Sequence, residues 1–149
     1  MVKQRASYEV TARSAAPPQQ VFDLLADAPS WRRWAGPMVM QSWWEREGSP
    51  APGGVGAIRR LGLCGVSSRE EIVVYDPPRH HGYTLLSGVV RDYRADVRLE
   101  PDGSGTRIVW SGSFTPTWFG SGPLIRRFFR QTIAGVARRL AAEAEKRQP

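Results

Sequence analysis

The chain has 149 residues, of which 41% are hydrophobic and 23% charged, and a formal net charge of +7. This length fits one domain, residues 1–149, with a substantial core. No apolar run approaches the roughly 20 residues that a membrane-spanning helix needs. The arginines occur as scattered pairs without a nucleic-acid-binding motif around them, so we expect no specific nucleic-acid partner.

Cys64 is the single cysteine, so no disulfide forms within the chain. A chain without disulfides suits a reducing compartment. The first ten residues also lack the apolar stretch of a secretory signal. We therefore expect a cytoplasmic protein in which Cys64 is a small buried apolar residue.

Strand character opens the chain. Residues 6–15 alternate in polarity, with every second residue from Tyr8 on an apolar face, which is typical of a half-buried strand. Residues 16–29 predict a helix that begins at Pro17–Pro18 and ends at Pro29. The apolar side of this helix consists of Val21, Phe22, Leu24 and Leu25.

A second short helix is predicted next, over residues 30–36, with Ser30 as its N-cap. Residues 38–47 return to strand character, and the glycine- and proline-rich residues 48–56 predict a loop. Short turn signals separate the strands that follow, and "PDGSG" at residues 101–105 is the clearest hairpin turn. These strands are predicted over residues 55–63, 67–76, 80–88, 92–101 and 105–114.

The last 25 residues change to a helical period. Apolar residues recur there at steps of three and four, and arginines fill the other side, which predicts a long amphipathic helix. Only the sheet is large enough to receive its apolar face, so the order of elements indicates an α+β fold with an antiparallel sheet around the final helix. The apolar face comprises Leu124, Ile125, Phe128, Phe129, Ile133, Val136, Ala137, Leu140 and Ala144.

Several short motifs follow one another along nearly the whole chain. They are residues 18–27, Trp31 and Trp34, 54–56, 69–72, 76–79, Tyr83 with 87–88, and 105–107 leading to Trp110. In this order they resemble the START/Bet v 1-like (SRPBCC) superfamily, and most of all its polyketide cyclase/dehydrase and lipid-transport family. The resemblance implies a helix-grip fold, in which a curved antiparallel sheet of about seven strands wraps around a long C-terminal helix, with two short helices after the first strand.

The two histidines, His80 and His81, are adjacent at the start of a predicted strand. Adjacent strand residues point to opposite faces, so the pair cannot converge on one metal ion. No other metal-ligand pattern and no phosphate-binding loop occurs, so we predict neither a metal site nor a cofactor. We expect at most one histidine to point inward, as a solvated residue at the rim of the sheet.

Six tryptophans are many for a chain of this length. They either fill a core or line an apolar pocket between the sheet and the long helix, and the sequence favours neither. Strand alternation adds inward-facing tyrosine, serine and phenylalanine side chains to this space. The candidate cavity residues are Trp31, Trp34, Trp43, Arg59, Glu71, Tyr83, Ser87, Tyr93, Trp110, Phe114 and Phe128.

Two pairs of neighbouring charged residues, Arg59–Arg60 and Glu70–Glu71, raise the question of which member faces the inside of the sheet. Alternation with apolar neighbours favours Arg59 over Arg60 as the inward arginine, whereas Glu70 and Glu71 are each compatible with facing inward. An inward arginine and glutamate on neighbouring strands would pair, since a lone buried charge is costly. We favour a structural role for such a pair over one in holding a ligand.

Two main classes of function suit such a fold. The favoured one is non-enzymatic binding or transport of a small hydrophobic molecule, such as a lipid, an isoprenoid or a polyketide-like compound. The alternative is a polyketide cyclase or dehydratase, in which Arg59, Glu71, Tyr83 or Tyr93 polarises a carbonyl or moves a proton. A protein- or RNA-interaction module is a lesser alternative.

The basic side of the last helix would allow weak contact with an anionic membrane surface, although we favour a solvated face as the explanation of these charges. The sequence leaves open whether the protein is a monomer or a homodimer.

Overall fold

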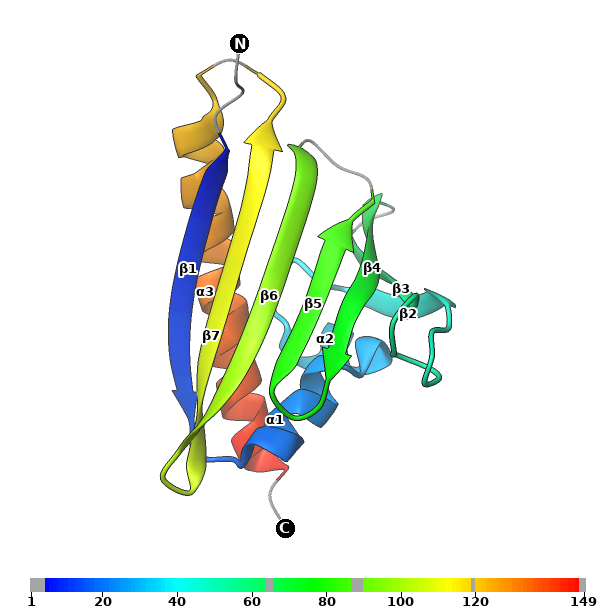
Figure 1. The fold of residues 1–149 in the computed structure, drawn as a ribbon, viewed down its shortest axis with the longest axis vertical. Helices are drawn as coiled ribbons and strands as arrows, with labels where there is room; N and C mark the ends of the chain where they lie inside the picture. Colours follow the sequence, from blue (N-terminus) through cyan, green and yellow to red (C-terminus); the bar gives the residue numbers. More distant parts are fainter. Residues whose placement is uncertain (1–4, 64–65, 87–89, 119, 148–149) are drawn as a thin grey trace.

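The computed structural model describes residues 5–63, 66–86, 90–118 and 120–147. Its strands form a seven-stranded antiparallel sheet with the order β1-β7-β6-β5-β4-β3-β2, so that β1 and β2 are the edges (Figure 1). The predicted α+β helix-grip architecture is therefore confirmed. The strands are β1 (Ala6–Ser14), β2 (Gln41–Arg46), β3 (Ile58–Leu63), β4 (Val66–Asp76), β5 (His80–Leu85), β6 (Val90–Asp102) and β7 (Gly105–Pro116).

The two short helices follow β1 as predicted. Helix α1 (Pro18–Leu25) buries its whole predicted apolar side, but it ends before Pro29, which lies in a 3-10 turn at Ala28–Ser30. Helix α2 (Trp31–Trp34) begins directly after that turn. Ser30 does not cap it, since its hydroxyl donates to the Asp27 carbonyl instead.

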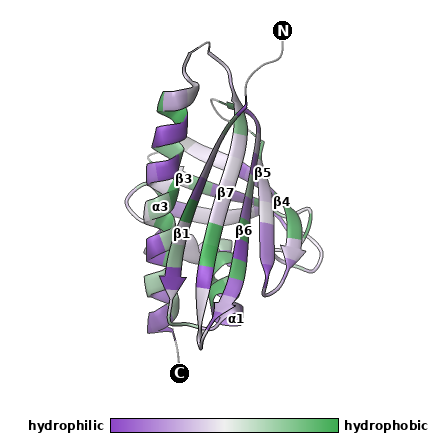
Figure 2. Cartoon of the chain, turned by 60° about the vertical axis from the view of Figure 1, so that its left-hand side comes forward, coloured by the Kyte–Doolittle hydropathy of each residue, from purple (hydrophilic) through white to green (hydrophobic). Residues whose placement is uncertain are grey.

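The long helix α3 (Gly122–Lys146) lies along one face of the sheet, mainly against β1 and β7 (Figures 1 and 2). Its fully buried residues begin only at Gly135. The first turns instead present Phe129 and Ile133 to the sheet while both remain partly exposed. None of the helices in the described ranges combines the length and apolar character that crossing a membrane requires.

Strand alternation sets the inner face of the sheet. The inward residues predicted in β6, from Tyr93 to Leu99, are buried, and so are Ile108, Trp110 and Phe114 of β7. Gly112 lies in the same inward series, opposite Tyr8 of β1. A Cβ atom on Gly112 would lie 2.5 Å from the Tyr8 ring, so the glycine provides the space in which that ring sits.

Candidate functional site

Seven of the predicted cavity residues lie together between the sheet and the helices. The rings are in contact: Trp31 lies 6.1 Å from Trp110, and Tyr83 lies 6.3 Å from Tyr93, between ring centroids. Trp34 packs on Trp31, and Phe114 packs on Tyr93. The seven are Trp31, Trp34, Arg59, Tyr83, Tyr93, Trp110 and Phe114, and all are buried.

Arg59 is the charged group of this interior. Only 1% of its side chain is exposed, which confirms that Arg59 and not Arg60 faces inward. Its Nε donates a hydrogen bond of 2.7 Å to Oε1 of Glu70, directly across from it on β4. The guanidinium carbon also lies 4.3 Å from the ring centroid of Trp31 and 4.5 Å from that of Tyr83. Such cation–π contacts are strong where water is excluded, and they help a buried arginine to stay charged.

The other two guanidinium nitrogens, Nη1 and Nη2, have no hydrogen-bond partner among the described residues. They are buried and together carry four N–H groups. A buried donor without an acceptor costs about 1–3 kcal/mol, and more when the group is charged. The interior therefore holds strong donors that lack an acceptor.

The glutamate that pairs with Arg59 is Glu70, so the prediction that Glu71 faces the interior is wrong. Glu71 points to the outer side and lies 3.6 Å from Arg46. The register of β4 against β5 shifts between Ile72 and Val74, which is a β-bulge. Because of this shift, Tyr75 turns inward although Glu71, which has the same parity, does not.

His81 is the second unexpected polar group of the interior. It is fully buried, and neither of its ring nitrogens has a partner among the described residues, so the expected solvated rim position is wrong. Its ring packs on Phe22 and Tyr83. Burial lowers the pKa of His81 well below its usual value, and the positive charge of Arg59 lowers it further. His81 is thus a neutral imidazole at physiological pH.

His80 points to the opposite face, where its Nε2 lies 2.6 Å from Oδ1 of Asp96. The expectation that the two histidines diverge is confirmed. Among the residues in the described ranges, no three histidine, cysteine, aspartate or glutamate side chains come together as metal ligands would.

The hydroxyl groups of three tyrosines are the other polar groups that we describe in the interior. Tyr8 and Tyr93 share a short hydrogen bond between their hydroxyls, and the indole nitrogen of Trp110 donates to the Tyr83 hydroxyl at 3.3 Å. Burial raises the pKa of all three tyrosines above the usual value. We call the following set the interior cluster: Tyr8, Trp31, Arg59, Glu70, His81, Tyr83, Tyr93 and Trp110.

Besides Glu71, two predicted cavity residues, Trp43 and Phe128, lie outside the interior. Trp43 is 40% exposed on the outer side of β2, where Arg60 lies over its ring, and Trp44 is the tryptophan that packs on the core. Phe128 is 54% exposed, and its neighbour Phe129 contacts the buried rings instead. Ser87 lies outside the described residues, as does Cys64.

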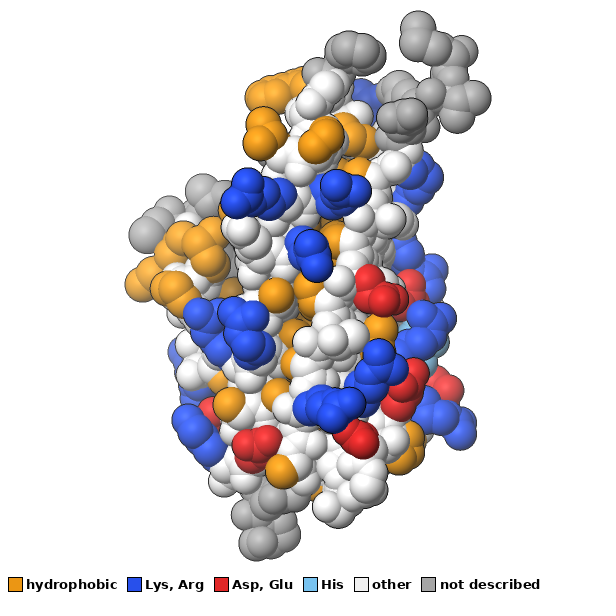
Figure 3. Space-filling view, turned by 90° about the vertical axis from the view of Figure 1, so that its left-hand side faces the viewer, with side chains coloured by type: hydrophobic (Ala, Val, Ile, Leu, Met, Phe, Trp, Pro, Cys, Tyr) orange, Lys and Arg blue, Asp and Glu red, His pale blue; other side chains and the backbone are white. Residues whose placement is uncertain are grey.

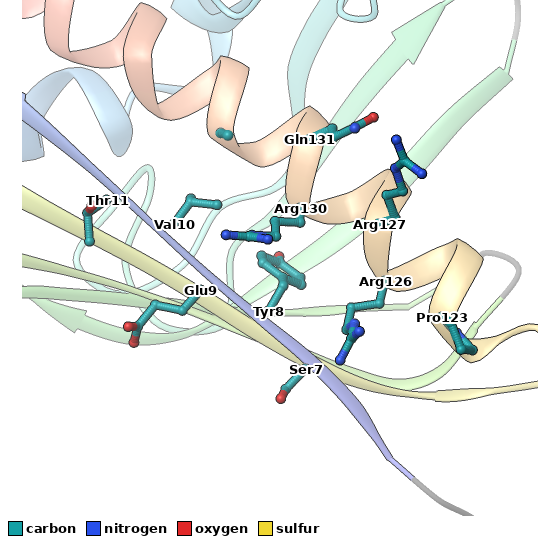
Figure 4. A pocket seen from close by; sticks show the side chains of 11 residues that line it. Ser7, Tyr8, Glu9, Val10, Thr11, Pro123, Arg126, Arg127, Arg130 and Gln131 are labelled. Carbon is teal, nitrogen blue, oxygen red and sulfur yellow. The ribbon is translucent and has the colours of Figure 1, made fainter.

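A groove with a volume of about 1050 Å³ runs between the edge strand β1 and α3. Figure 4 shows Tyr8 pointing from β1 toward the helix, while Arg126 and Arg130 reach from the helix toward the strand. Ser7 and Glu9 point away from the helix. Tyr8 therefore joins the groove to the interior cluster, because its hydroxyl meets Tyr93 inside.

The interior cluster combines a fixed cation, a neutral imidazole and protonated phenols within aromatic walls. Its unpartnered groups favour an acceptor oxygen, and its rings favour an apolar or aromatic body. Sequence reasoning missed Tyr8, Glu70 and His81 as members. A signal for His81 was present, because it has the same parity as the inward Tyr83.

Comparison with known proteins gives a family and a fold. The family described as "Polyketide cyclase / dehydrase and lipid transport" matches residues 5–145. An uncharacterized protein of Mycobacterium tuberculosis is 28% identical over 146 residues, which cover 89% of this chain and 85% of that protein.

Solved structures share the fold at low sequence identity. A START superfamily protein from Mycobacterium smegmatis has a TM-score of 0.77 at 16% identity, over 95% of this chain and 99% of that one. The ZhuI aromatase/cyclase from Streptomyces sp. R1128 has a TM-score of 0.75 at 19% identity, over 97% of this chain and 96% of that one.

Proposed function

Since this chain belongs to the polyketide cyclase/dehydrase and lipid-transport family, we propose that it binds a small hydrophobic molecule through an oxygen atom of that molecule. In this proposal the oxygen accepts hydrogen bonds from Arg59 in the interior cluster. The apolar or aromatic remainder packs on the rings of Trp31, Tyr83 and Trp110.

One observation carries the proposal: the buried Nη1 and Nη2 of Arg59 and both ring nitrogens of His81 have no partner among the described residues. A carbonyl, enolate or carboxylate oxygen would satisfy the guanidinium. For the neutral imidazole, a carbonyl would accept from its N–H group, and a hydroxyl would be able to donate to its other nitrogen. A purely hydrocarbon ligand would leave these groups unpaired and would gain nothing from them.

Entry to the interior is proposed along the groove between β1 and the first turns of α3. Those turns are held less firmly than the rest of the helix, since their inward residues Ile125, Phe129 and Ile133 remain partly exposed. Elements with few buried contacts open at lower cost than the core does. Tyr8 lies where the groove meets the cluster.

Catalysis is the second candidate function, and the state of His81 favours it. A neutral imidazole is able to accept a proton from a carbon next to a carbonyl, and a nearby guanidinium stabilises the enolate that results. These are steps of cyclisation and dehydration of a poly-β-ketone. The aromatase/cyclase from Streptomyces sp. R1128, which shares the fold, supports this candidate.

The binding proposal is tested by isothermal titration calorimetry with 2-naphthoate and naphthalene, which differ only in the carboxylate. We expect the wild-type protein to prefer 2-naphthoate by about 10-fold or more, because hydrogen bonds to a charged group contribute about 1.5–3 kcal/mol. The variant Arg59→Met/Glu70→Gln removes both charges together and should lose that preference. Arg60→Met, on the outer face of the same strand, is the matched control and should keep it. Equal affinity of the wild type for the two compounds would reject the proposal.

Catalysis is tested separately with a short poly-β-ketone thioester, followed by mass spectrometry for loss of water. If His81 is the base, His81→Leu should still bind the thioester and should fail to convert it. Unchanged conversion by His81→Leu would exclude this role for His81.

A further inference from the structure

The positive charge of the chain is concentrated in its C-terminal part. No aspartate or glutamate occurs between Asp102 and Glu143, whereas arginines recur throughout that segment. Three of these arginines, Arg126, Arg127 and Arg130, lie exposed in the first turns of α3. They account for much of the net charge and lie close together.

These three arginines lack the acidic partners that several arginines on the sheet have. None of them forms an ion pair with any residue of the described ranges. On the outer face of the sheet, by contrast, Arg13 lies 3.5 Å from Asp102 and Arg107 lies 3.2 Å from Glu100. The start of α3 is therefore a region of uncompensated positive charge.

Large apolar side chains lie exposed at the same end of the helix. Leu124 is 74% exposed and Phe128 54%, and they share one helix face because they are four residues apart. Trp118, in the connection from β7 to α3, is 77% exposed. Figure 3 shows apolar side chains gathered at this end of the molecule, next to arginines.

We propose that this docking surface, formed by Trp118, Leu124, Phe128, Arg126, Arg127 and Arg130, binds the surface of an anionic lipid bilayer. Arg127, three residues after Leu124, borders the exposed apolar side chains, whereas Arg126 and Arg130 lie on the flank of the helix that faces β1. Arginines that flank exposed aromatic and aliphatic side chains in this way match the boundary between charged headgroups and acyl chains. The arginines attract the anionic headgroups, and the apolar side chains enter the outermost layer of the bilayer. An RNA or an acidic protein surface would satisfy the arginines but would leave Leu124 and Phe128 without an apolar environment.

Docking by this surface is independent of what the interior cluster binds. If both hold, the groove between β1 and α3 opens close to the membrane, since Arg126 and Arg130 line it. A hydrophobic ligand would then pass between bilayer and protein over a short distance.

The test is flotation of the full-length protein with vesicles of phosphatidylcholine, with and without one third phosphatidylserine. We expect binding to the anionic vesicles only, weakened by salt of about 0.5 M because exposed charges are then screened. Arg126→Gln/Arg127→Gln/Arg130→Gln should weaken binding by about a hundredfold. The matched control Arg13→Gln/Arg98→Gln/Arg107→Gln removes the same charge from exposed positions on the outer face of the sheet and should bind within about threefold of the wild type.

A second pair of variants tests the apolar part. Leu124→Ser/Phe128→Ser should weaken binding by about tenfold or more, whereas Met38→Ser/Met40→Ser, at exposed positions elsewhere, should not. The proposal is overturned if the protein does not bind anionic vesicles, or if it binds RNA and not vesicles. It is also overturned if the triple variant in α3 and the triple control variant lose equal affinity for the vesicles. Titration of 2-naphthoate without vesicles reports on the interior separately, so the two proposals fail independently.

Discussion

Arg59 and Glu70 face each other across β3 and β4, with the arginine Nε 2.7 Å from the glutamate Oε1. The two terminal nitrogens of Arg59 have no partner in the part of the chain that the structure describes. The pair uses one edge of the guanidinium and leaves the other edge open. A purely structural ion pair would be expected to satisfy both ions, since burying an incompletely bonded charge is costly. The geometry therefore supports a second acceptor for Arg59, which the proposed ligand would supply.

Removing one member of this pair should destabilise the fold much more than removing both. Arg59→Met leaves the Glu70 carboxylate, 12% exposed, without its partner, and we expect a loss of about 3–5 kcal/mol in the free energy of unfolding. Arg59→Met/Glu70→Gln should recover most of that loss. Urea denaturation of the wild type, both single variants and the double variant measures the coupling. Additive effects of the two substitutions would contradict a direct interaction.

His81 should make the fold sensitive to mild acid. Its pKa is lowered in the folded protein, whereas in the unfolded chain it is about 6.5. Below that pH the unfolded chain binds a proton that the folded protein does not, so stability falls as the pH falls, by at most about 1.4 kcal/mol per pH unit. Above it, His81 contributes no pH dependence.

Unfolding measured between pH 5 and 7 checks this dependence. His81→Leu should flatten the stability curve below about pH 6.5, and His80→Gln, which keeps His81, should not. An NMR titration in which the His81 ring protonates near pH 6.5 would contradict its buried position.

The three interior tyrosines should resist ionisation while the protein is folded. Burial raises the pKa of Tyr8, Tyr83 and Tyr93 above the usual value of 10. Absorbance at 295 nm should therefore report no more than one of the four tyrosines as phenolate at pH 11, and all four after unfolding in urea at the same pH. Two or more phenolates in the folded protein would mean that solvent reaches the cluster.

The buried position of the Tyr8 ring should require a residue without a side chain at position 112. In Gly112→Ala the new Cβ would lie 2.5 Å from ring atoms of Tyr8, a buried side chain that has to shift. We expect a loss of about 1–3 kcal/mol, typical of overpacking in a core. In a Tyr8→Ala background the same substitution should cost less than about 0.5 kcal/mol. Thermal unfolding of the four proteins decides whether the two residues interact as described.

The sequence predicts the fold well because the hydrophobic periodicity of each segment, and the order of helices and strands, can be read from short stretches of the chain. Alternation in residues 92–101 and 105–114 identifies the inner face of the two longest strands, and both predictions are confirmed. The buried position of Arg59 follows from the same alternation. These strands pair in a regular register over most of their length, so inward and outward residues alternate without interruption there.

The site is harder to predict because parity fails at irregular positions. The bulge between Ile72 and Val74 breaks the alternation that would have placed Glu71 and Tyr75 on one face. In α3, Leu124 and Phe128 widen the apolar arc beyond the part of the helix that the sheet covers, so helical period alone assigns Phe128 wrongly to the interior. The burial of His81 depends on α1, because Phe22 packs on its ring, and that contact is not visible in the sequence.

The most direct test of a ligand oxygen at the interior cluster is a crystal structure of the wild-type protein grown with 2-naphthoate. We predict electron density for the naphthalene ring against Trp31, Tyr83 and Trp110, with a carboxylate oxygen within hydrogen-bonding distance of Nη1 or Nη2 of Arg59. Density for 2-naphthoate only in surface grooves, with those nitrogens still unpartnered, would contradict it.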